Sequence, residues 1–158
     1  MGSSSPNRLE ALSLYDEVRQ CWVKATPEEQ VRQRWLKWMI HRLKYPKELL
    51  VVEKEIKELP HLSGKVVPQR RVDILCYGKG IHPAHSLYPL VMIECKDEPL
   101  SDAAVDQVIG YNHHVKAFFI AVVNLKEVQF GFLNAHQKRY EFHSIFPSFM
   151  ELIQWVKS

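Results

Sequence analysis

Apolar residues in the first part of the chain recur at helical spacing. Residues 6–24 are predicted to form a helix, whose apolar members are Leu9, Leu12, Val18, Cys21 and Trp22. A second helix is expected from Thr26, because Thr26 suits an N-cap, Pro27 suits the first helical position, and Glu29 completes a capping box. Its apolar residues recur at spacings of three and four: Val31, Trp35, Trp38 and Met39. The Tyr45-Pro46 pair is expected to end this helix.

Beyond residue 48 the pattern changes to short apolar runs rich in β-branched residues. Strands are predicted at residues 49–56, 71–77, 90–95, 117–123, 128–133 and 139–143, with a turn-rich connector at 60–68 and a Gly- and Pro-containing loop at 78–89. Ser101 can cap a helix that runs to about Val115, and Pro147 opens a closing helix. The order α, α, β, β, β, α, β, β, β, α predicts an α/β fold, a mixed central sheet flanked by helices.

Composition indicates one soluble domain. The chain has 158 residues, of which 46% are hydrophobic and 25% charged, and this length fits a single domain. No apolar run approaches the ~20 residues that cross a bilayer, so no membrane association is expected. The N-terminus lacks the apolar core of a secretory signal, which favours a cytoplasmic location. The net charge of +3 permits a nucleic-acid partner without predicting one.

The three cysteines are widely spaced and odd in number. Cys21, Cys76 and Cys95 each lie among apolar residues, which favours buried free thiols over disulfides. No histidine and cysteine pair has zinc-finger spacing, so a structural zinc site is not expected.

Charged residues interrupt two of the predicted strands. Asp73 lies within an apolar run, and Glu94 and Lys96 close another, on the same strand face. Two carboxylates about 4 Å apart repel by roughly 4 kcal/mol at an effective dielectric constant near 20. A divalent cation removes that repulsion, and carboxylate oxygens suit Mg²⁺ or Mn²⁺. The alternative interpretation is that Lys96 simply pairs with Glu94 at a strand end.

Four segments in this order and spacing resemble a known family: residues 27–33 (PEEQVRQ), 71–74 (RVDI), 93–96 (IECK), and Gln107 to Tyr111. Together they resemble the PD-(D/E)XK nuclease superfamily, and most closely the N-terminal nuclease domain of type I restriction enzyme R subunits. Val72 stands where the family name has proline. The resemblance implies a restriction-endonuclease-like core at residues 26–124, between an N-terminal helical extension (1–25) and C-terminal strands and helix (125–158).

The resemblance also implies a metal-dependent DNA endonuclease that uses Mg²⁺, for which Mn²⁺ can substitute. In this family the two strand acids bind the metal, which carries over to Asp73 and Glu94. The backbone carbonyl of Cys95 is expected as a further ligand, and Lys96 is expected to orient the attacking water or stabilise charge on the phosphate.

A glutamate on the first core helix often completes such a site. Glu28 is the expected residue, because it shares the face of Val31 and Trp35, whereas the capping box accounts for Glu29. The alternative is that both glutamates only complement the helix dipole, worth ~0.3–1 kcal/mol.

DNA contacts are expected from the motif at residues 107–111 and from a basic rim. Gln107 and Tyr111 are four residues apart and share one helical face, where the resemblance implies contact with DNA or support of the active residues. Arg70 and Arg71 are expected to bind phosphates, within a wider set that comprises Arg32, Arg34, Lys37, Arg42, Lys44 and Gln69. A solvated helix face explains the first five of that set equally well.

The sequence leaves the partners open. No P-loop is present, and a complete R subunit carries a motor after its nuclease domain. We therefore expect a free-standing nuclease-like domain acting on double-stranded DNA, or one that works through partner subunits or as a homo-oligomer. The alternatives are a non-catalytic nucleic-acid-binding module and a protein-interaction subunit, the latter because four tryptophans are many for one core of this size.

Overall fold

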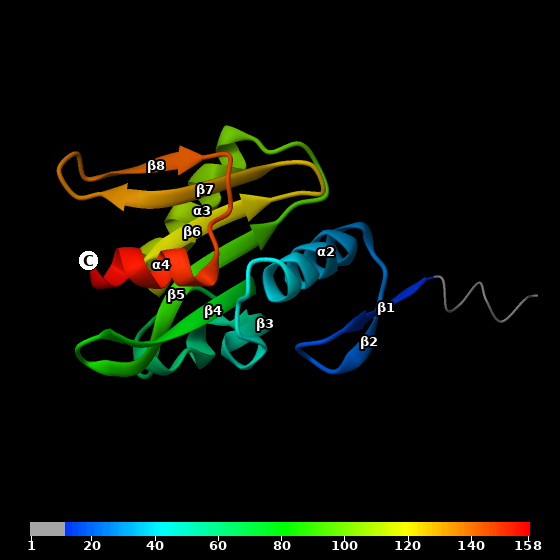
Figure 1. Cartoon of the computed structure of the whole chain (residues 1–158), viewed down its shortest axis with the longest axis horizontal. Helices are drawn as coiled ribbons and strands as arrows, with labels where there is room; N and C mark the ends of the chain where they lie inside the picture. Colours follow the sequence, from blue (N-terminus) through cyan, green and yellow to red (C-terminus); the bar gives the residue numbers. More distant parts are fainter. Residues whose placement is uncertain (1–11) are drawn as a thin grey trace, which may run out of the picture.

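A six-stranded mixed sheet forms the centre of the molecule (Figure 1). The structure, a computed structural model, describes residues 12–158. The strands lie in sequence order across the sheet: β3 (Leu50–Glu55), β4 (Arg71–His82), β5 (His85–Cys95), β6 (Phe119–Val123), β7 (Val128–Asn134) and β8 (Arg139–His143). Only the β5–β6 pair is parallel among the pairs of this sheet. The predicted mixed α/β fold is therefore confirmed.

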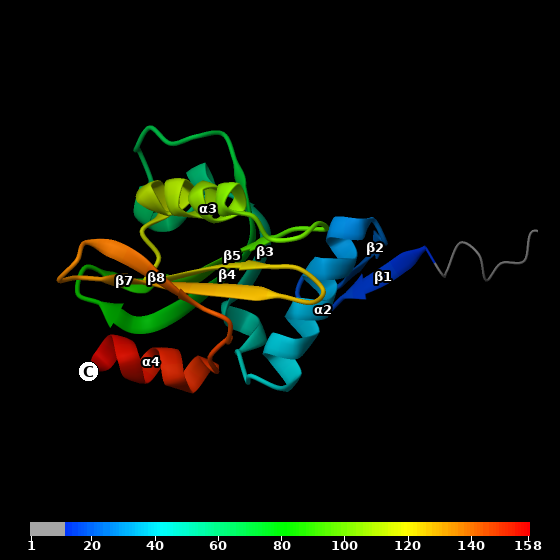
Figure 2. The same cartoon turned by 90° about the horizontal axis from the view of Figure 1, so that it is seen from above.

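Three α-helices pack around this sheet (Figure 2). They are α2 (Pro27–His41), α3 (Asp102–Val115) and α4 (Phe149–Lys157). Short 3-10 turns join the elements around β3: η1 (Lys47–Leu49), η2 (Ile56–Glu58) and η3 (Pro60–Leu62). Helices α3 and α4 cover opposite faces, and α2 crosses one end of the sheet. The helix α3 connects the parallel strands β5 and β6, as such a crossover requires. No described helix is long and apolar enough to span a membrane.

The N-terminus of α2 is capped as predicted, but only in part. The Thr26 hydroxyl accepts a hydrogen bond from the Glu29 backbone N–H at 3.2 Å. The reciprocal hydrogen bond of the capping box, from the Thr26 N–H to the Glu29 side chain, is not formed. The Thr26 N–H donates instead to the Lys24 carbonyl at 2.9 Å. The Glu29 carboxylate is thereby left for other partners, and these are described below.

The prediction of an N-terminal helical extension is wrong for the residues that the structure describes. Residues 13–24 form an antiparallel hairpin of β1 (Ser13–Asp16) and β2 (Cys21–Lys24). The Asp16 carboxylate closes its turn by accepting hydrogen bonds from the N–H groups of Val18 (2.8 Å) and Arg19 (2.7 Å). This local side-chain hydrogen bonding competes with helix formation. Residues 6–11 of the predicted helix lie outside the described residues.

The loop predicted at residues 78–89 is also wrong in extent. Strands β4 and β5 continue through most of this range and pair as a long hairpin that includes Pro89, opposite Tyr77. Two irregularities in the register and a left-handed Gly80 (φ +66°) accommodate the turn-forming residues within the ribbon. Glycine and proline therefore mark bends of the strands here rather than their ends.

The core lies between the sheet and its helices. Strand β6 is buried along its whole length, as expected for a strand covered on both faces. Cys76 and Cys95 are buried free thiols, as predicted, and burial raises the pKa of each thiol. Cys21 is exposed on β2, which corrects the prediction that it is buried.

Candidate functional site

Strands β4 and β5 bring two carboxylates together. Their antiparallel register pairs Ile74 with Ile93, and one residue further along it places Asp73 beside Glu94. Both residues are buried, at 8% and 7% exposure. One oxygen of Asp73, Oδ2, accepts a hydrogen bond from the Cys95 backbone N–H at 2.8 Å, which fixes the carboxylate against the end of β5.

Glu94 lies in an environment that disfavours its charge. Burial and the nearby charge of Asp73 raise the pKa of Glu94 to about 9. Its Oε1 atom is buried and has no hydrogen-bond partner among the described residues. An acceptor in that position normally has a partner, because leaving it unsatisfied costs ~1–3 kcal/mol.

Lys96 is held by helix α3. Its Nζ donates a hydrogen bond to Gln107 Oε1 at 2.8 Å. No ion pair joins Lys96 to Glu94 anywhere in residues 12–158, so the structure does not favour the alternative that they form a simple pair at a strand end. The sequence placed Gln107 beside the site, and the structure gives it a specific contact there.

The two glutamates of the first helical turn have exchanged their expected environments. The Glu28 side chain is 53% exposed and Glu29 is buried. Glu28 nevertheless lies near the acidic pair, since burial and then the charge of Asp73 raise the pKa of Glu28. Glu28 therefore stands at the rim of the site, while Glu29 belongs to the ionic network behind it.

Arg32 is the centre of that network, which the sequence did not reveal. The expectation that Arg32 belongs to a basic surface rim is wrong, because it is buried. Its guanidinium donates to Asp73 Oδ1 at 2.9 Å and to Glu29, and lies 3.3 Å from Glu53 and 3.5 Å from Glu28. Burial lowers the pKa of Arg32, but the hydrogen bond and charge of Asp73 outweigh it and raise the pKa overall.

A second arginine ties the N-terminal hairpin to the same network. Arg19 contacts Asp16 (2.7 Å), Glu29 (2.5 Å) and Glu53 (3.2 Å). Glu53 lies opposite Asp73 in the β3–β4 register and has a left-handed φ of +51°, an uncommon conformation for a residue other than glycine. The only sequence signal for this ionic network is the spacing of charges three and four residues apart in α2. That spacing also fits an ordinary solvated helix face.

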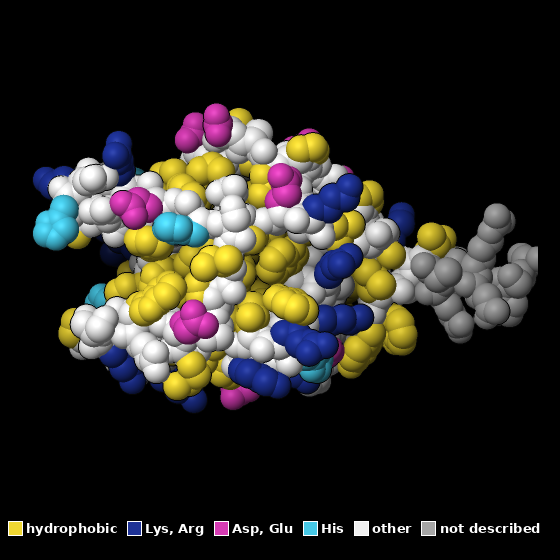
Figure 3. Space-filling view, turned by 45° about the horizontal axis from the view of Figure 1, so that its top comes forward, with side chains coloured by type: hydrophobic (Ala, Val, Ile, Leu, Met, Phe, Trp, Pro, Cys, Tyr) yellow, Lys and Arg dark blue, Asp and Glu magenta, His cyan; other side chains and the backbone are white. Residues whose placement is uncertain are grey.

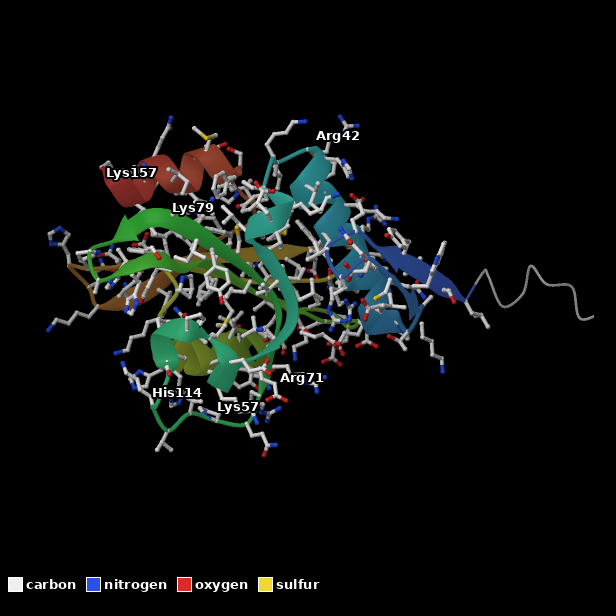
Figure 4. All side chains as sticks on the ribbon, turned by 90° about the horizontal axis from the view of Figure 1, so that it is seen from below. Arg42, Lys57, Arg71, Lys79, His114 and Lys157 are labelled. Atoms are coloured by element: carbon white, nitrogen blue, oxygen red, sulfur yellow. The ribbon has the colours of Figure 1, made fainter. Side chains whose placement is uncertain are left out.

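The remaining predicted DNA-binding residues lie on the flank of the site that carries α3. The Arg70 guanidinium lies 5.5 Å from the ring centroid of Tyr111, a cation–π contact. Arg71 is exposed and lies 3.7 Å from Glu55. Figure 4 shows Arg71 on the α3 side of the sheet and Arg42 on the α4 side. The structure thus groups Gln107 with Lys96, Arg70 with Tyr111, and separates Arg71 from the basic residues of α2.

Oxygen donors around Asp73 and Glu94 are of the kind that Mg²⁺ prefers. The orphaned Glu94 Oε1 is a buried acceptor that a cation would satisfy. Within residues 12–158, no group of three or more His, Cys, Asp or Glu side chains is arranged to hold a metal. A Mg²⁺ ion here would therefore rely on two carboxylates, a backbone carbonyl and water or phosphate oxygens, a ligand set that is usual for this ion.

An apolar cavity of about 910 Å³ lies away from these acids. Phe119, Phe132, Tyr140 and Trp155 are among its lining residues, and none of its lining residues is Asp or Glu. In Figure 3 an apolar surface runs between β8 and α4 in this region. This cavity contains histidines but no carboxylate that could hold a divalent cation, so the candidate site is the acidic pair.

Comparison with known proteins agrees with the resemblance drawn from the four segments. The family model of the type I restriction enzyme R protein N terminus (HSDR_N) matches residues 27–147. Neither the curated proteins nor the solved structures gave a significant match. The matched range contains the acidic pair, Lys96, and the arginine of α2 that contacts Asp73. The chain therefore belongs to the family of type I restriction enzyme R protein N termini.

Proposed function

We propose that this chain is a PD-(D/E)XK-type nuclease domain that hydrolyses phosphodiester bonds of double-stranded DNA with Mg²⁺. The observation that carries the proposal is the buried Asp73–Glu94 pair with Lys96 beside it. Family membership supports a restriction-related nuclease role. The proposed core is residues 26–124, and the proposed compartment is the cytoplasm, which fits a DNA substrate and free thiols.

Each residue of the site has a proposed role in hydrolysis, and Glu28 at the rim is proposed to support a metal ligand or a second ion. Asp73 and Glu94 would hold the cation together with the Cys95 backbone carbonyl. When bound, the cation neutralises developing charge and lowers the pKa of water. Lys96, fixed by Gln107, orients the attacking water or donates to a phosphate oxygen. The water oxygen bonds to phosphorus and its proton passes to solvent, while the bond to the leaving sugar oxygen breaks and that oxygen takes a proton from solvent.

The α3 flank is proposed to hold the DNA. Arg71 is exposed and Arg70 lies over Tyr111, so both cations are available near the acidic pair without a buried partner. Contacts of this kind fix the register of a duplex without reading its sequence. Partner subunits, or a second copy of the chain, would supply any sequence recognition.

A second candidate function rests on Arg32. Its guanidinium already compensates the charge of Asp73, so that charge is balanced without a metal. This favours a non-catalytic nucleic-acid-binding or partner-binding module that retains the nuclease fold. Arg32 cannot compensate Glu94 in the same way, because Glu94 Oε1 has no partner among the described residues, and we therefore rank the nuclease first.

Nicking of supercoiled plasmid distinguishes the two. We expect relaxed and linear products with Mg²⁺ or Mn²⁺, none in EDTA, and none with Asp73→Asn. Asp106→Asn is the matched control, because Asp106 is exposed on α3 and has no ion pair among the described residues. DNA binding without metal-dependent nicking would establish the module instead.

A further inference from the structure

The outer face of α2 bears a basic groove with aromatic walls. A cavity of about 530 Å³ lies there, lined by Arg34, Trp35, Lys37, Trp38, His41, Arg42 and Leu125. None of these residues is acidic. Figure 3 shows Lys and Arg side chains gathered beside apolar side chains at the end of the molecule that holds α2. This groove is distinct from the α3 flank already described.

Three cations of the groove have no acidic partner among the described residues, whereas His41 in the same lining hydrogen-bonds Glu17 at 2.8 Å. Arg34, Lys37 and Arg42 form no ion pair within residues 12–158. The Arg42 guanidinium lies 5.9 Å from the Trp38 ring centroid, and Trp38 is 49% exposed. An exposed indole beside cations that have no acidic partner is suited to an anionic ligand that has flat apolar rings.

The groove adjoins a second cavity that reaches Lys96. Leu125, in the β6–β7 loop, lines both, and this second cavity of about 360 Å³ is also lined by Lys96 and Lys126 and by three acids, Asp97, Glu98 and Glu127. Trp38 follows Glu28 by ten residues of helix, which is roughly 15 Å at 1.5 Å per residue. A strand leaving the acidic pair would therefore reach the groove after a few nucleotides.

We propose that this groove binds an unpaired nucleic-acid strand adjacent to the phosphate that is cleaved. Arg34, Lys37 and Arg42 contact its phosphates, and a base stacks on Trp38. A base inside a duplex is stacked on both faces and offers none to an indole, so the groove selects a strand separated from its complement. The inference rests on the proposed function in taking nucleic acid as the substrate, and it adds a junction between duplex and single strand as the preferred form.

The two flanks of the site fit the two parts of such a substrate. Arg71 lies on the α3 side and Arg42 on the α4 side, with α2 crossing the end of the sheet between them (Figures 2 and 4). The α3 flank is proposed to hold the duplex and the α2 groove the unpaired arm. The acidic pair lies where these two surfaces meet, near the N-terminus of α2.

Fluorescence anisotropy with labelled DNA in EDTA tests the proposal without any cleavage. The probes are a blunt duplex, a single strand, and a forked duplex of matched sequence. Trp38→Ala is expected to weaken binding of the fork and the single strand by roughly 5- to 150-fold, because stacking is worth ~1–3 kcal/mol per base. Binding of the blunt duplex should be unchanged, and Trp38→Phe should restore most of the affinity for the fork.

Trp22→Ala is the matched control, because Trp22 is a more exposed tryptophan that lies on β2 and does not line the groove. Lys37→Ala provides a second variant, expected to flatten the salt dependence of fork binding. Equal losses on the blunt duplex and the fork, or no loss on either, would overturn the inference. If plasmid nicking persists in that case, the nuclease proposal stands alone. If wild-type protein binds none of the probes in EDTA, the inference fails, and plasmid nicking with Mg²⁺ decides the nuclease proposal separately.

Discussion

Glu94 illustrates how a single residue can indicate a missing ligand. It is buried beside another carboxylate, and one of its oxygens has no hydrogen-bond partner in the described part of the chain. Its neighbour Asp73 has two partners, Arg32 and the Cys95 N–H. A buried oxygen without a partner on one acid, beside a neighbour whose two oxygens are both bonded, is expected where a cation completes the site.

The first prediction concerns the pH dependence of stability without metal. The pKa of Glu94 is about 9 in the folded protein against 4.5 for an ordinary glutamate, so the folded state binds the extra proton. The stability that this group contributes is thus fully present below about pH 4.5 and is lost as the pH rises toward 9. Glu94→Gln should remove this loss and raise the free energy of unfolding in EDTA by on the order of 1–3 kcal/mol at alkaline pH.

Urea unfolding at acidic and alkaline pH measures this difference. Asp106→Asn should follow the wild-type curve, since Asp106 is exposed on α3. If Glu94→Gln and wild type lose stability in parallel as pH rises, Glu94 is ionised in the folded protein and the electrostatic account of the pair is wrong.

The second prediction concerns the contact between Gln107 and Lys96. A hydrogen bond to a charged group is worth ~1.5–3 kcal/mol, so Gln107→Ala should lower kcat for plasmid nicking by roughly 10- to 100-fold. Affinity for Mn²⁺ should be unchanged, because neither residue is a proposed ligand. A rise in KM with unchanged kcat would show instead that Gln107 contacts DNA.

At the scale of elements, the hairpin β1–β2 acts as a brace for α2. Asp16 is fully buried and bonds Arg19 and Gln33, and Arg19 reaches across to Glu29 of α2 and Glu53 of β3. Burial raises the pKa of Asp16, but its hydrogen bonds with Arg19 and Gln33 lower it overall. The hairpin thus holds the helix whose N-terminus borders the acidic pair.

The third prediction follows from this brace. Arg19→Ala leaves Asp16 and Glu29 without a shared cation, although Asp16 keeps Gln33 and Glu29 keeps Arg32. Because Arg19 is only partly buried, we expect a loss of about 1–3 kcal/mol in urea unfolding at neutral pH. Lys24→Ala, an exposed change on the same hairpin, should be nearly neutral. A neutral Arg19→Ala would show that the hairpin does not stabilise α2.

Elements with a clear local signal were predictable from the sequence. Capping by Thr26 and Ser101 and the apolar run of β6 marked their elements well, and β8 was predicted with its observed bounds. The hairpin was missed because Asp16 closes its turn through side-chain bonds that no apolar spacing reveals. The extension of β4 and β5 was missed because glycine and proline there sit within an irregular ribbon.

The candidate site was predictable where it depends on strand neighbours, and not where it depends on packing between elements. Asp73 and Glu94 stand out as charges within apolar strands, and their proximity follows once the strands pair. Whether Glu28 or Glu29 is buried depends on Arg19, which comes from a different element. Arg32 resembles any surface arginine on a helix until Asp73 and Glu53 are placed beside it.

At the level of the whole molecule, one acidic site lies between two surfaces that we propose bind nucleic acid. The sheet places Asp73 and Glu94 at the end that α2 crosses, α3 supplies Gln107 and Tyr111 on one flank, and the outer face of α2 supplies the groove on the other. The family match, residues 27–147, includes the acidic pair, α2 and α3. The proposed hydrolysis requires that the acidic pair hold a divalent cation.

Calorimetric titration with Mn²⁺ tests that claim most directly. We predict that wild-type protein binds Mn²⁺, that Asp73→Asn and Glu94→Gln each abolish binding, and that Lys96→Ala retains it, because an ammonium group is not a ligand. Circular dichroism should show all four proteins folded alike. No heat of binding from wild type, or equal binding by wild type and both carboxylate variants, would contradict the account.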